Sequence, residues 1–438
     1  MEVQIMSRET IKPSSPTPEH LRTYKLGLFD QLASPIYVPI TLFYSARDGN
    51  PGMNSDHLKK SLSKSLTQFY PLAGRIKDDH LTIDCNDDGA TFIEAQVACD
   101  LSFVLEDPEI EVLQLLLPCN PLEHLPHQSQ SITDQVILAA QVNYFACGGM
   151  AIGVCISHVI ADTSAAAHFL KAWAAVAFGA DNIEGVIYDC SSHFPPQDLS
   201  FYYRVMSLLE EYNNVESSED EVVTKRLLFD GSKIADLRNE MGSDGLNLFR
   251  PTRVEAVTAL IWEALITATA ENDRTSQILE ASIAVNMRKR MNPPLPEQCI
   301  GSICFVTNAR SHNEKIENRS RLSRKIHESI NEIDDEYIRK IYTSGECFNK
   351  FMEKSYEEYE KNPKIGVFYF TSWCRFPFYE TDFGFGKPIW VVGGLRVNRI
   401  ACFLDTSDGE GIEAWISLTK EEMAKLEQQP GILAYATF

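Results

Sequence analysis

The sequence lacks any uninterrupted apolar run of the roughly 18 residues that a membrane-spanning helix requires. It also lacks an apolar secretory segment, because Met1–Thr23 is polar and rich in proline. Both absences argue against a membrane or secreted protein, and we therefore expect a cytoplasmic one.

Positive charge is scarce as well. The 438 residues include 40 Lys and Arg against 61 Asp and Glu, which gives a formal net charge of −21. Nucleic acids and anionic membranes select basic surfaces, so the composition disfavours both as partners. A small anionic ligand stays possible because it needs only a local basic pocket. We expect a monomer that acts on small molecules.

The eleven cysteines show no Cys-x-x-Cys spacing of the kind that holds zinc. Several of them, Cys155, Cys304 and Cys402 among them, lie in apolar runs, where a reduced cysteine behaves as a small hydrophobic residue. The Gly-x-Ser-x-Gly elbow of serine hydrolases is also missing. We therefore expect no metal, no permanently bound cofactor and no covalent serine nucleophile.

Strand and helix patterns alternate along both halves of the chain, which predicts the α/β class. Two domains of roughly 200 residues each are expected from the length. We place an N-terminal domain at 1–190, an acidic crossover linker at 191–222 and a C-terminal domain at 223–438.

Several local elements follow from pattern and turn chemistry. Residues 81–84 and 90–95 resemble a hairpin around Asn86-Asp-Asp-Gly89, and 135–145 with 150–157 resemble a second hairpin. An alanine-rich helix is expected at 163–178. The segment Thr252-Arg-Val-Glu255 has the spacing of a helix capping box.

The most informative candidate is His158, which ends the apolar strand at 150–157 and precedes Asp162 by four residues. The same His-x-x-x-Asp spacing recurs at His80 and Asp84, in a polar, turn-rich stretch, so spacing alone is weak. A histidine at a rigid strand end can act as a general base. It can also be a structural histidine without a catalytic role.

Asp162 has two interpretations. It can orient the imidazole of His158, as the carboxylate of a catalytic triad does. It can instead cap the helix at 163–178 or form half of an ion pair, which we favour because a capping carboxylate satisfies unpaired helix amides.

Two further stretches stand out. Asp382-Phe-Gly-Phe-Gly386 predicts a tight, closely packed backbone, either in a turn between strands or at a functional site, and it lacks the spacing of a phosphate-binding loop. Arg288-Lys-Arg290 concentrates positive charge after a buried strand. Either this is a solvated strand end, or one arginine turns inward to a buried carboxylate while others face an anionic ligand.

Together these stretches resemble the plant BAHD acyltransferase family. Ser157-His158-Val-Ile-Ala-Asp162 and Asp382-Phe-Gly-Phe-Gly386-Lys-Pro388 resemble its two signatures, in the expected order and separation. Tyr70-Pro-Leu-Ala-Gly-Arg75, Asn286-Met-Arg288 and Thr371-Ser-Trp-Cys-Arg375 add to a likeness that covers essentially the whole chain. The chain is most similar to the vinorine synthase-like branch of alkaloid O-acetyltransferases.

The resemblance implies two chloramphenicol acetyltransferase-like domains, each a mixed β-sheet with flanking helices, and a substrate channel between them. It implies acyl transfer from acyl-CoA, most readily acetyl-CoA, to a hydroxyl of a plant specialised metabolite. In this branch the acceptor is expected to be an alkaloid, with an acylsugar or another alcohol or amine as the alternative.

The resemblance also implies roles for individual residues. His158 is the general base of a ternary complex, and Asp162 pairs with Arg288 away from the reaction. The loop containing Asp382, Gly384 and Gly386 supports the site. By charge and placement, Arg253, Lys289 and Arg290 are candidates for binding the CoA phosphates. Thr252 is a further candidate for CoA binding that could line the channel, and Ser372 and Trp373 are candidates for lining its acceptor side.

Two positions depart from the family pattern. Phe385 stands where the family usually has tryptophan, and Ser302 follows Gly301 where the family has asparagine. The oxyanion-stabilising group therefore stays unassigned. Two rival functions stay open: a hydrolase in which His158 activates water on an ester, and a non-catalytic member that kept the fold.

Overall fold

The computed structural model describes residues 1–46, 55–77, 81–123, 135–180, 185–188, 190–200, 202, 222–242, 249–270, 278–312, 317–342, 345–361 and 365–438. His80 and most of the expected acidic linker lie outside these residues. The chain forms two compact units. Unit 1 comprises Met1–Pro196, Leu295–Ile303 and Phe376–Leu395, and unit 2 comprises Gln197–Pro294, Cys304–Arg375 and Arg396–Phe438.

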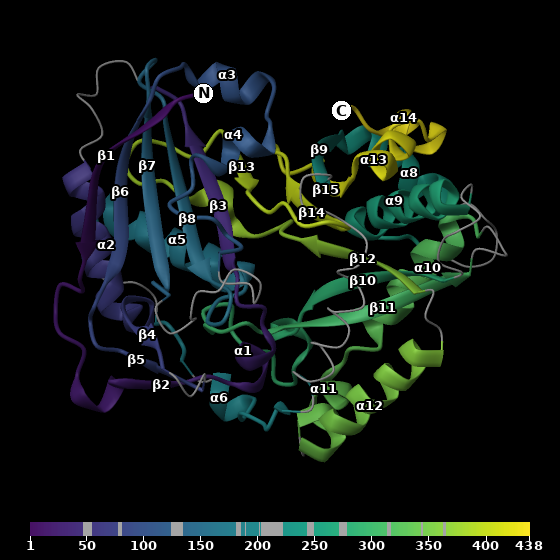
Figure 1. The fold of residues 1–438 in the computed structure, drawn as a ribbon, viewed down its shortest axis with the longest axis horizontal. Helices are drawn as coiled ribbons and strands as arrows, with labels where there is room; N and C mark the ends of the chain where they lie inside the picture. The colour runs from purple at the N-terminus through teal and green to yellow at the C-terminus, as the bar shows by residue number, and fades with distance from the viewer. Residues whose placement is uncertain are drawn as a thin grey trace. The chain divides into compact units, whose positions relative to one another are not determined.

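Unit 1 is built on a six-stranded mixed sheet (Figure 1). β6 and β7 are parallel, and every other neighbouring pair is antiparallel. In spatial order the strands are β1 (Val3–Ile11), β6 (Ala90–Val97), β7 (Leu138–Phe145), β8 (Met150–Ser157), β3 (Tyr37–Tyr44) and β13 (Trp390–Gly393). A separate three-stranded sheet contains β2 (Thr23–Lys25), β5 (Thr82–Asp84) and β4 (Arg75–Ile76).

The helices of unit 1 include two long ones that pack against each other, α2 (Ser55–Gln68) and α5 (Thr163–Phe178). In α2, Leu58, Leu62 and Leu66 recur every four residues and are all buried, which is the expected apolar face. The other helices of unit 1 among the described residues are short: η1 (Glu19–Leu21), α1 (Leu28–Leu32), η2 (Tyr70–Ala73), α3 (Leu101–Glu106), α4 (Ile110–Gln114), α6 (Cys190–His193) and η7 (Pro377–Glu380).

Unit 2 contains a second six-stranded mixed sheet. β10 pairs in parallel with β12, which pairs in parallel with β14, while the other neighbours are antiparallel. Its order is β11 (Cys304–His312), β10 (Ile278–Asn286), β12 (Ile365–Ser372), β14 (Ile400–Asp405), β15 (Ile412–Thr419) and β9 (Val222–Phe229). Its helices are α8 (Gly231–Gly242), α9 (Arg253–Ala270), η6 (Arg288–Arg290), α10 (Arg319–Asn331), α11 (Asp335–Tyr342), α12 (Gly345–Lys361), α13 (Lys420–Leu426) and α14 (Pro430–Tyr435).

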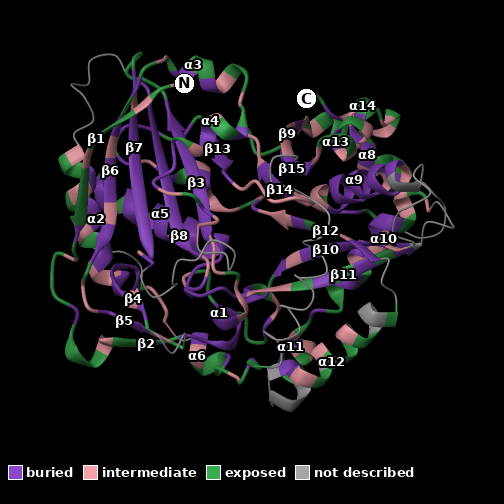
Figure 2. Cartoon of the chain, in the orientation of Figure 1, coloured by how far each residue is buried: buried purple, intermediate pink, exposed green. Residues whose placement is uncertain are grey.

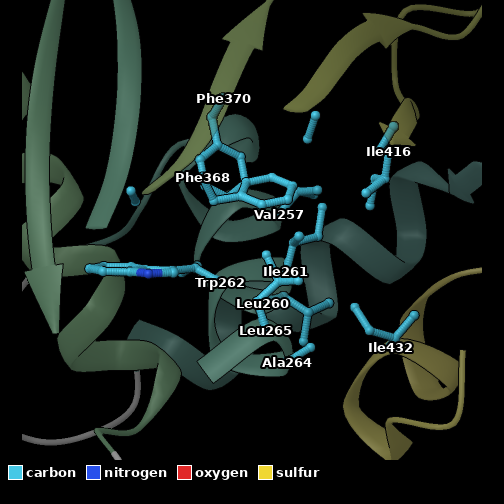
Figure 3. Close-up of a cluster of buried hydrophobic side chains, with 14 of the residues drawn as sticks. Val257, Leu260, Ile261, Trp262, Ala264, Leu265, Phe368, Phe370, Ile416 and Ile432 are labelled. Atoms are coloured by element: carbon cyan, nitrogen blue, oxygen red, sulfur yellow. The ribbon is translucent and has the colours of Figure 1, made fainter. Parts of the chain in front are cut away.

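Each unit has its own hydrophobic core. β8 and β3, which are neighbours in the unit 1 sheet, are buried along their whole length (Figure 2). In unit 2, helix α9 lies across the sheet, and its Leu260, Ile261 and Trp262 are fully buried. Figure 3 shows these side chains beside Phe368 and Phe370 of β12. The predicted α/β class with two sheet-bearing domains is confirmed.

The local predictions have mixed outcomes. The hairpin of β7 and β8 and the helix α5 are confirmed. The hairpin predicted for 81–84 and 90–95 is wrong, because β5 joins the small sheet while β6 pairs with β1 and β7. A turn signal fixes where the chain reverses, but strand partners are chosen by tertiary packing.

The expected linear division into domains also differs from the observed one. We placed Asp382–Gly386 in a C-terminal domain, whereas Phe376–Leu395 belongs to unit 1. The physical reason is that β13 adds to the edge of the first sheet by pairing with β3, and Ile389 donates its amide to the carbonyl of Phe43. Leu295–Ile303 also belongs to unit 1, because its backbone forms isolated bridges with Ala161 and Ile187.

Among the described residues, no helix is both long and apolar enough to cross a membrane.

Candidate functional site

His158 lies directly after the last residue of β8, in the turn that leads to α5. Its backbone amide donates to the carbonyl of Ile36 at 2.8 Å, which ties the turn to the segment before β3. β8 is a central strand paired on both sides, so the residue that follows it has a well-defined position. The predicted placement of His158 at a rigid strand end is confirmed.

The imidazole of His158 makes two interactions that bear on its protonation. Nδ1 lies 3.1 Å from Oγ of Ser302, and the ring also hydrogen-bonds to the backbone of His158 itself. In the tautomer with the proton on Nδ1, Ser302 Oγ accepts from that N–H and the lone pair of the neutral ring lies on Nε2.

Burial lowers the pKa of His158 below its usual value near 6.5, because the charged imidazolium loses hydration. The hydrogen bond to its own backbone and the negative charge of Asp162 oppose this shift. The net effect favours the neutral ring at neutral pH. This is the form that can accept a proton.

Asp162 is the N-cap of α5. Its backbone is extended, and its Oδ1 accepts from the amide of Ala165 at 2.8 Å. The interpretation of Asp162 as a helix cap is therefore confirmed. Its negative charge acts on His158, and the hydroxyl of Ser302 lies within hydrogen-bond distance of the imidazole.

The segment that carries Ser302 is held against this turn by backbone contacts. Gly301 accepts from the amide of Asp162 at 3.4 Å and forms a parallel bridge with Ala161. Gly301 has φ +139°, and a Cβ there would lie 2.9 Å from Sγ of Cys190. Glycine is thus required both by conformation and by close approach.

Asp30 is the residue that sequence reasoning missed. It is fully buried in α1, and its Oδ1 accepts from the amide of Ser302 at 2.7 Å. Its Oδ2 accepts from the amide of Gly27 at 2.8 Å. Burial raises the pKa of Asp30 to about 6, although both amides oppose the shift. The acid three residues after Gly27 is a capping signal, but nothing local connects it with Ser302.

The stretch Asp382–Gly386 is a tight loop held by one carboxylate. Oδ1 of Asp382 accepts from the amides of Gly384 and Gly386, both at 2.8 Å. Both glycines have positive φ, +100° and +107°. Phe385 is buried and packs edge-on against Tyr44 with ring centroids 4.8 Å apart. The prediction of a tight, closely packed backbone is confirmed.

The expected CoA-binding residues lie in unit 2 and have different surroundings. Arg253 donates to the carbonyls of Gly409 and Glu410 at 2.7 Å and to Asp405 at 2.8 Å. Arg290 donates to the carbonyls of Ile330 and Ile333, at the end of α10. Both guanidinium groups thus hold the fold of unit 2.

The other expected CoA-binding residues, and Arg288 beside them, differ in burial and in hydrogen-bond partners. Lys289 is exposed. Thr252 caps α9 in the predicted capping box, because its amide donates to Glu255 at 2.7 Å and its Oγ1 accepts from the Glu255 amide at 3.2 Å. Arg288 is fully buried and bonds to Asn286 Oδ1 through its amide and its guanidinium.

Of the acceptor-channel candidates, Ser372 ends β12 and is half-buried, and its Oγ accepts from the amide of Cys374 at 3.4 Å. Trp373 is buried, and its amide donates to the carbonyl of Phe403 at 2.8 Å. Within the described part of the chain, no group of three His, Cys, Asp or Glu residues is arranged to hold a metal ion.

Comparisons with known proteins agree over the full length. A family model described as the Transferase family matches residues 1–432. A limonoid 21-O-acetyltransferase of Citrus sinensis is 45% identical over 440 residues, covering 100% of this chain and 99% of that protein. Epi-neemfruitin B synthase L1AT of Melia azedarach is 44% identical over 442 residues, with the same coverage. The crystal structure of vinorine synthase matches with a TM-score of 0.82 at 35% identity, covering 99% of this chain and 98% of that one.

Proposed function

The chain belongs to the plant BAHD family of acyltransferases, and from this premise we propose that it transfers an acetyl group from acetyl-CoA to a hydroxyl of a plant specialised metabolite. Enzymes of this family use acyl-CoA as a co-substrate. The observation that carries the proposal is the full-length match, at 44–45% identity, to enzymes named as limonoid acetyltransferases. The orientation of the His158 ring supports it independently.

We assign the role of general base to His158. With Nδ1 protonated and hydrogen-bonded to Ser302, Nε2 offers its lone pair to the acceptor hydroxyl. As Nε2 takes the hydroxyl proton, the oxygen attacks the thioester carbonyl and a tetrahedral intermediate forms. The C–S bond then breaks, and the leaving thiolate takes the proton from the imidazolium. General base help of this kind contributes about 10²- to 10⁴-fold in rate.

No covalent acyl-enzyme is needed in this scheme, so both substrates bind before reaction. Holding the thioester and the alcohol together supplies the advantage of proximity. Thr252 and Lys289 are our candidates for contacts with CoA, with Arg253 and Arg290 supporting the same region through the backbone contacts described above. Ser372 and Trp373 stay candidates for the acceptor side.

Three further expectations stay predictions: the pairing of Asp162 with Arg288, a cytoplasmic location and a monomeric state.

For the acceptor, we favour a bulky polycyclic alcohol of the limonoid type. Relatives named for limonoids share 44–45% identity with this chain, whereas relatives named for alkaloids, such as stemmadenine O-acetyltransferase of Catharanthus roseus, share 37%. An alkaloid alcohol, expected from sequence, is therefore the second candidate. Sequence identity therefore ranks the limonoid alcohol above the alkaloid alcohol. The choice of acceptor itself depends on the shape of the pocket, which an experiment must test.

The decisive experiment incubates the purified protein with acetyl-CoA and matched panels of limonoid, alkaloid and sugar alcohols, and measures thiol release together with the acylated product. We expect thiol release that depends on an alcohol from the first two panels. Thiol release without acceptor, or cleavage of the acetylated products, would support the hydrolase. No product from any panel, with bound acetyl-CoA detected by calorimetry, would support a non-catalytic member.

A further inference from the structure

Asp30 has a place in unit 1 that the proposed mechanism does not use. Its carboxylate is fully buried, far along the chain from the His158 turn, and it belongs to neither family signature. Three groups donate to it: the amides of Ser302 and Gly27 and the thiol of Cys190. A buried carboxylate with this many donors is an anchor point for the segments that supply them.

The segment that Asp30 anchors is the one that contacts the base. Ser302 is 1% exposed, and its amide and its hydroxyl lie on one residue, so the bond at 2.7 Å to Asp30 restricts where Oγ can be. That Oγ lies 3.1 Å from Nδ1 of His158. The connection therefore runs from Asp30 through the Ser302 backbone to the imidazole.

Backbone hydrogen bonds also hold the two residues that precede Ser302. Ile300 donates to the carbonyl of Ile187, and Gly301 accepts from Asp162. Gly301 has φ +139°, a conformation that favours glycine, and the backbone turns at this residue. The amide directly after that turn is the one that Asp30 binds.

We propose that Asp30 is a positioning residue for the catalytic base: by binding the Ser302 amide it holds Ser302 Oγ on Nδ1 of His158, and so keeps Nε2 as the proton acceptor. This inference rests on the proposed function of His158. Asp30 touches no reacting atom, and it acts through Ser302.

The test is a double-mutant cycle of Asp30→Asn and Ser302→Ala. Asparagine offers one acceptor oxygen and one amino group, so one of the two backbone amides loses its acceptor. We expect each single variant to lower kcat about tenfold, with KM for acetyl-CoA and for the acceptor within about twofold of wild type. The double variant should have the kcat of Ser302→Ala alone, because the two residues act in series.

The pH profile gives a readout that a purely structural role would not change. An acceptor on Nδ1–H stabilises the imidazolium more than the neutral ring. Both single variants should therefore move the acid limb of kcat/KM to lower pH. Asp87→Asn is the matched control, because Asp87 in the same unit also accepts a backbone amide of a distant residue, Thr17, at 2.9 Å. It should leave kcat and the acid limb unchanged.

Additive losses in the double variant, or a wild-type kcat in Asp30→Asn, would overturn the proposal. Asp30→Ser is the second variant, since its hydroxyl can still accept from one amide. If neither Asp30 variant folds while Asp87→Asn does, Asp30 serves folding and the positioning role is wrong. His158→Ala separates the two hypotheses: activity without His158 refutes the proposed base, whereas loss there with normal Asp30→Asn refutes this inference alone.

Discussion

The Oγ of Ser302 lies 3.1 Å from Nδ1 of His158, although 144 positions separate the two residues in the sequence. Ser302 occupies the position where the family pattern has asparagine. An asparagine side chain is one atom longer and offers an amino group and a carbonyl oxygen, whereas serine offers one hydroxyl that can both donate and accept. In this chain, the residue at that position lies next to Nδ1 of His158, the ring nitrogen that our proposed mechanism does not use as the proton acceptor.

Replacement of His158 by alanine should abolish the proposed acyl transfer while the protein stays folded. Loss of a general base costs about 10²- to 10⁴-fold in rate. The measurement is turnover of acetyl-CoA with acceptor, beside the melting temperature. His20→Ala, at an exposed histidine of the same unit, is the control. Activity close to wild type in His158→Ala would reject the base.

The pH dependence of kcat/KM should show an acid limb below pH 6.5. The base must be neutral, and burial lowers the pKa of His158 below its ordinary value of 6.5. Activity should therefore be level near neutral pH and fall about tenfold per pH unit once the imidazole is protonated. A profile of kcat/KM from pH 4.5 to 8.5 measures this. An acid limb centred above pH 7 would contradict the environment described for His158.

Asp162→Ala should destabilise the protein by about 0.5–2 kcal/mol, because the first turn of α5 loses its cap. Asparagine caps helices about as well as aspartate. If capping is the sole contribution of Asp162, Asp162→Asn should match wild type within a few tenths of a kcal/mol. A larger loss of stability in Asp162→Asn would show that the negative charge of Asp162 also contributes, which the predicted pairing with Arg288 requires. Urea unfolding of both variants decides between these outcomes.

Asp382→Ala should lower stability without lowering kcat per folded molecule. The variant loses two hydrogen bonds from the amides of Gly384 and Gly386 to a charged acceptor, at about 1.5–3 kcal/mol for such a group. Gly384→Ala should cost about 1–3 kcal/mol from backbone strain alone, since φ is +100° and nothing lies near an added Cβ. Lys387→Ala, an exposed neighbour, is the control for thermal unfolding. A fall in kcat with unchanged stability would instead place the loop in catalysis.

Two of the cations proposed for the CoA region should respond differently to substitution. Arg253→Ala should lower stability by about 1–3 kcal/mol, because its guanidinium holds the backbone at Gly409 and Glu410 together with Asp405. Lys289→Ala should raise KM for acetyl-CoA, more strongly at low salt, because Lys289 is exposed. Unchanged KM for acetyl-CoA across a salt series would remove Lys289 from the proposed CoA site.

The sequence predicted several local features of the site correctly. β8, the position of His158 after it, helix α5 and its Asp162 cap were all predictable, as was the capping box of Thr252 and Glu255. These features depend on hydrophobic periodicity and on side chains within a few residues of the atoms they satisfy. The printed sequence therefore contains both partners of each interaction within one short window.

The tertiary structure alone decided which distant segments meet. β13 joins the sheet of unit 1 rather than that of unit 2, and β5 and β6 enter different sheets despite the turn between them. The bond from Ser302 to Asp30 joins residues 272 positions apart. Strand partners and buried hydrogen bonds are chosen by the packing of the whole chain, and no short stretch of sequence encodes them. The sequence thus located the histidine that we propose as the base, and the fold determined which side chain lies against its ring.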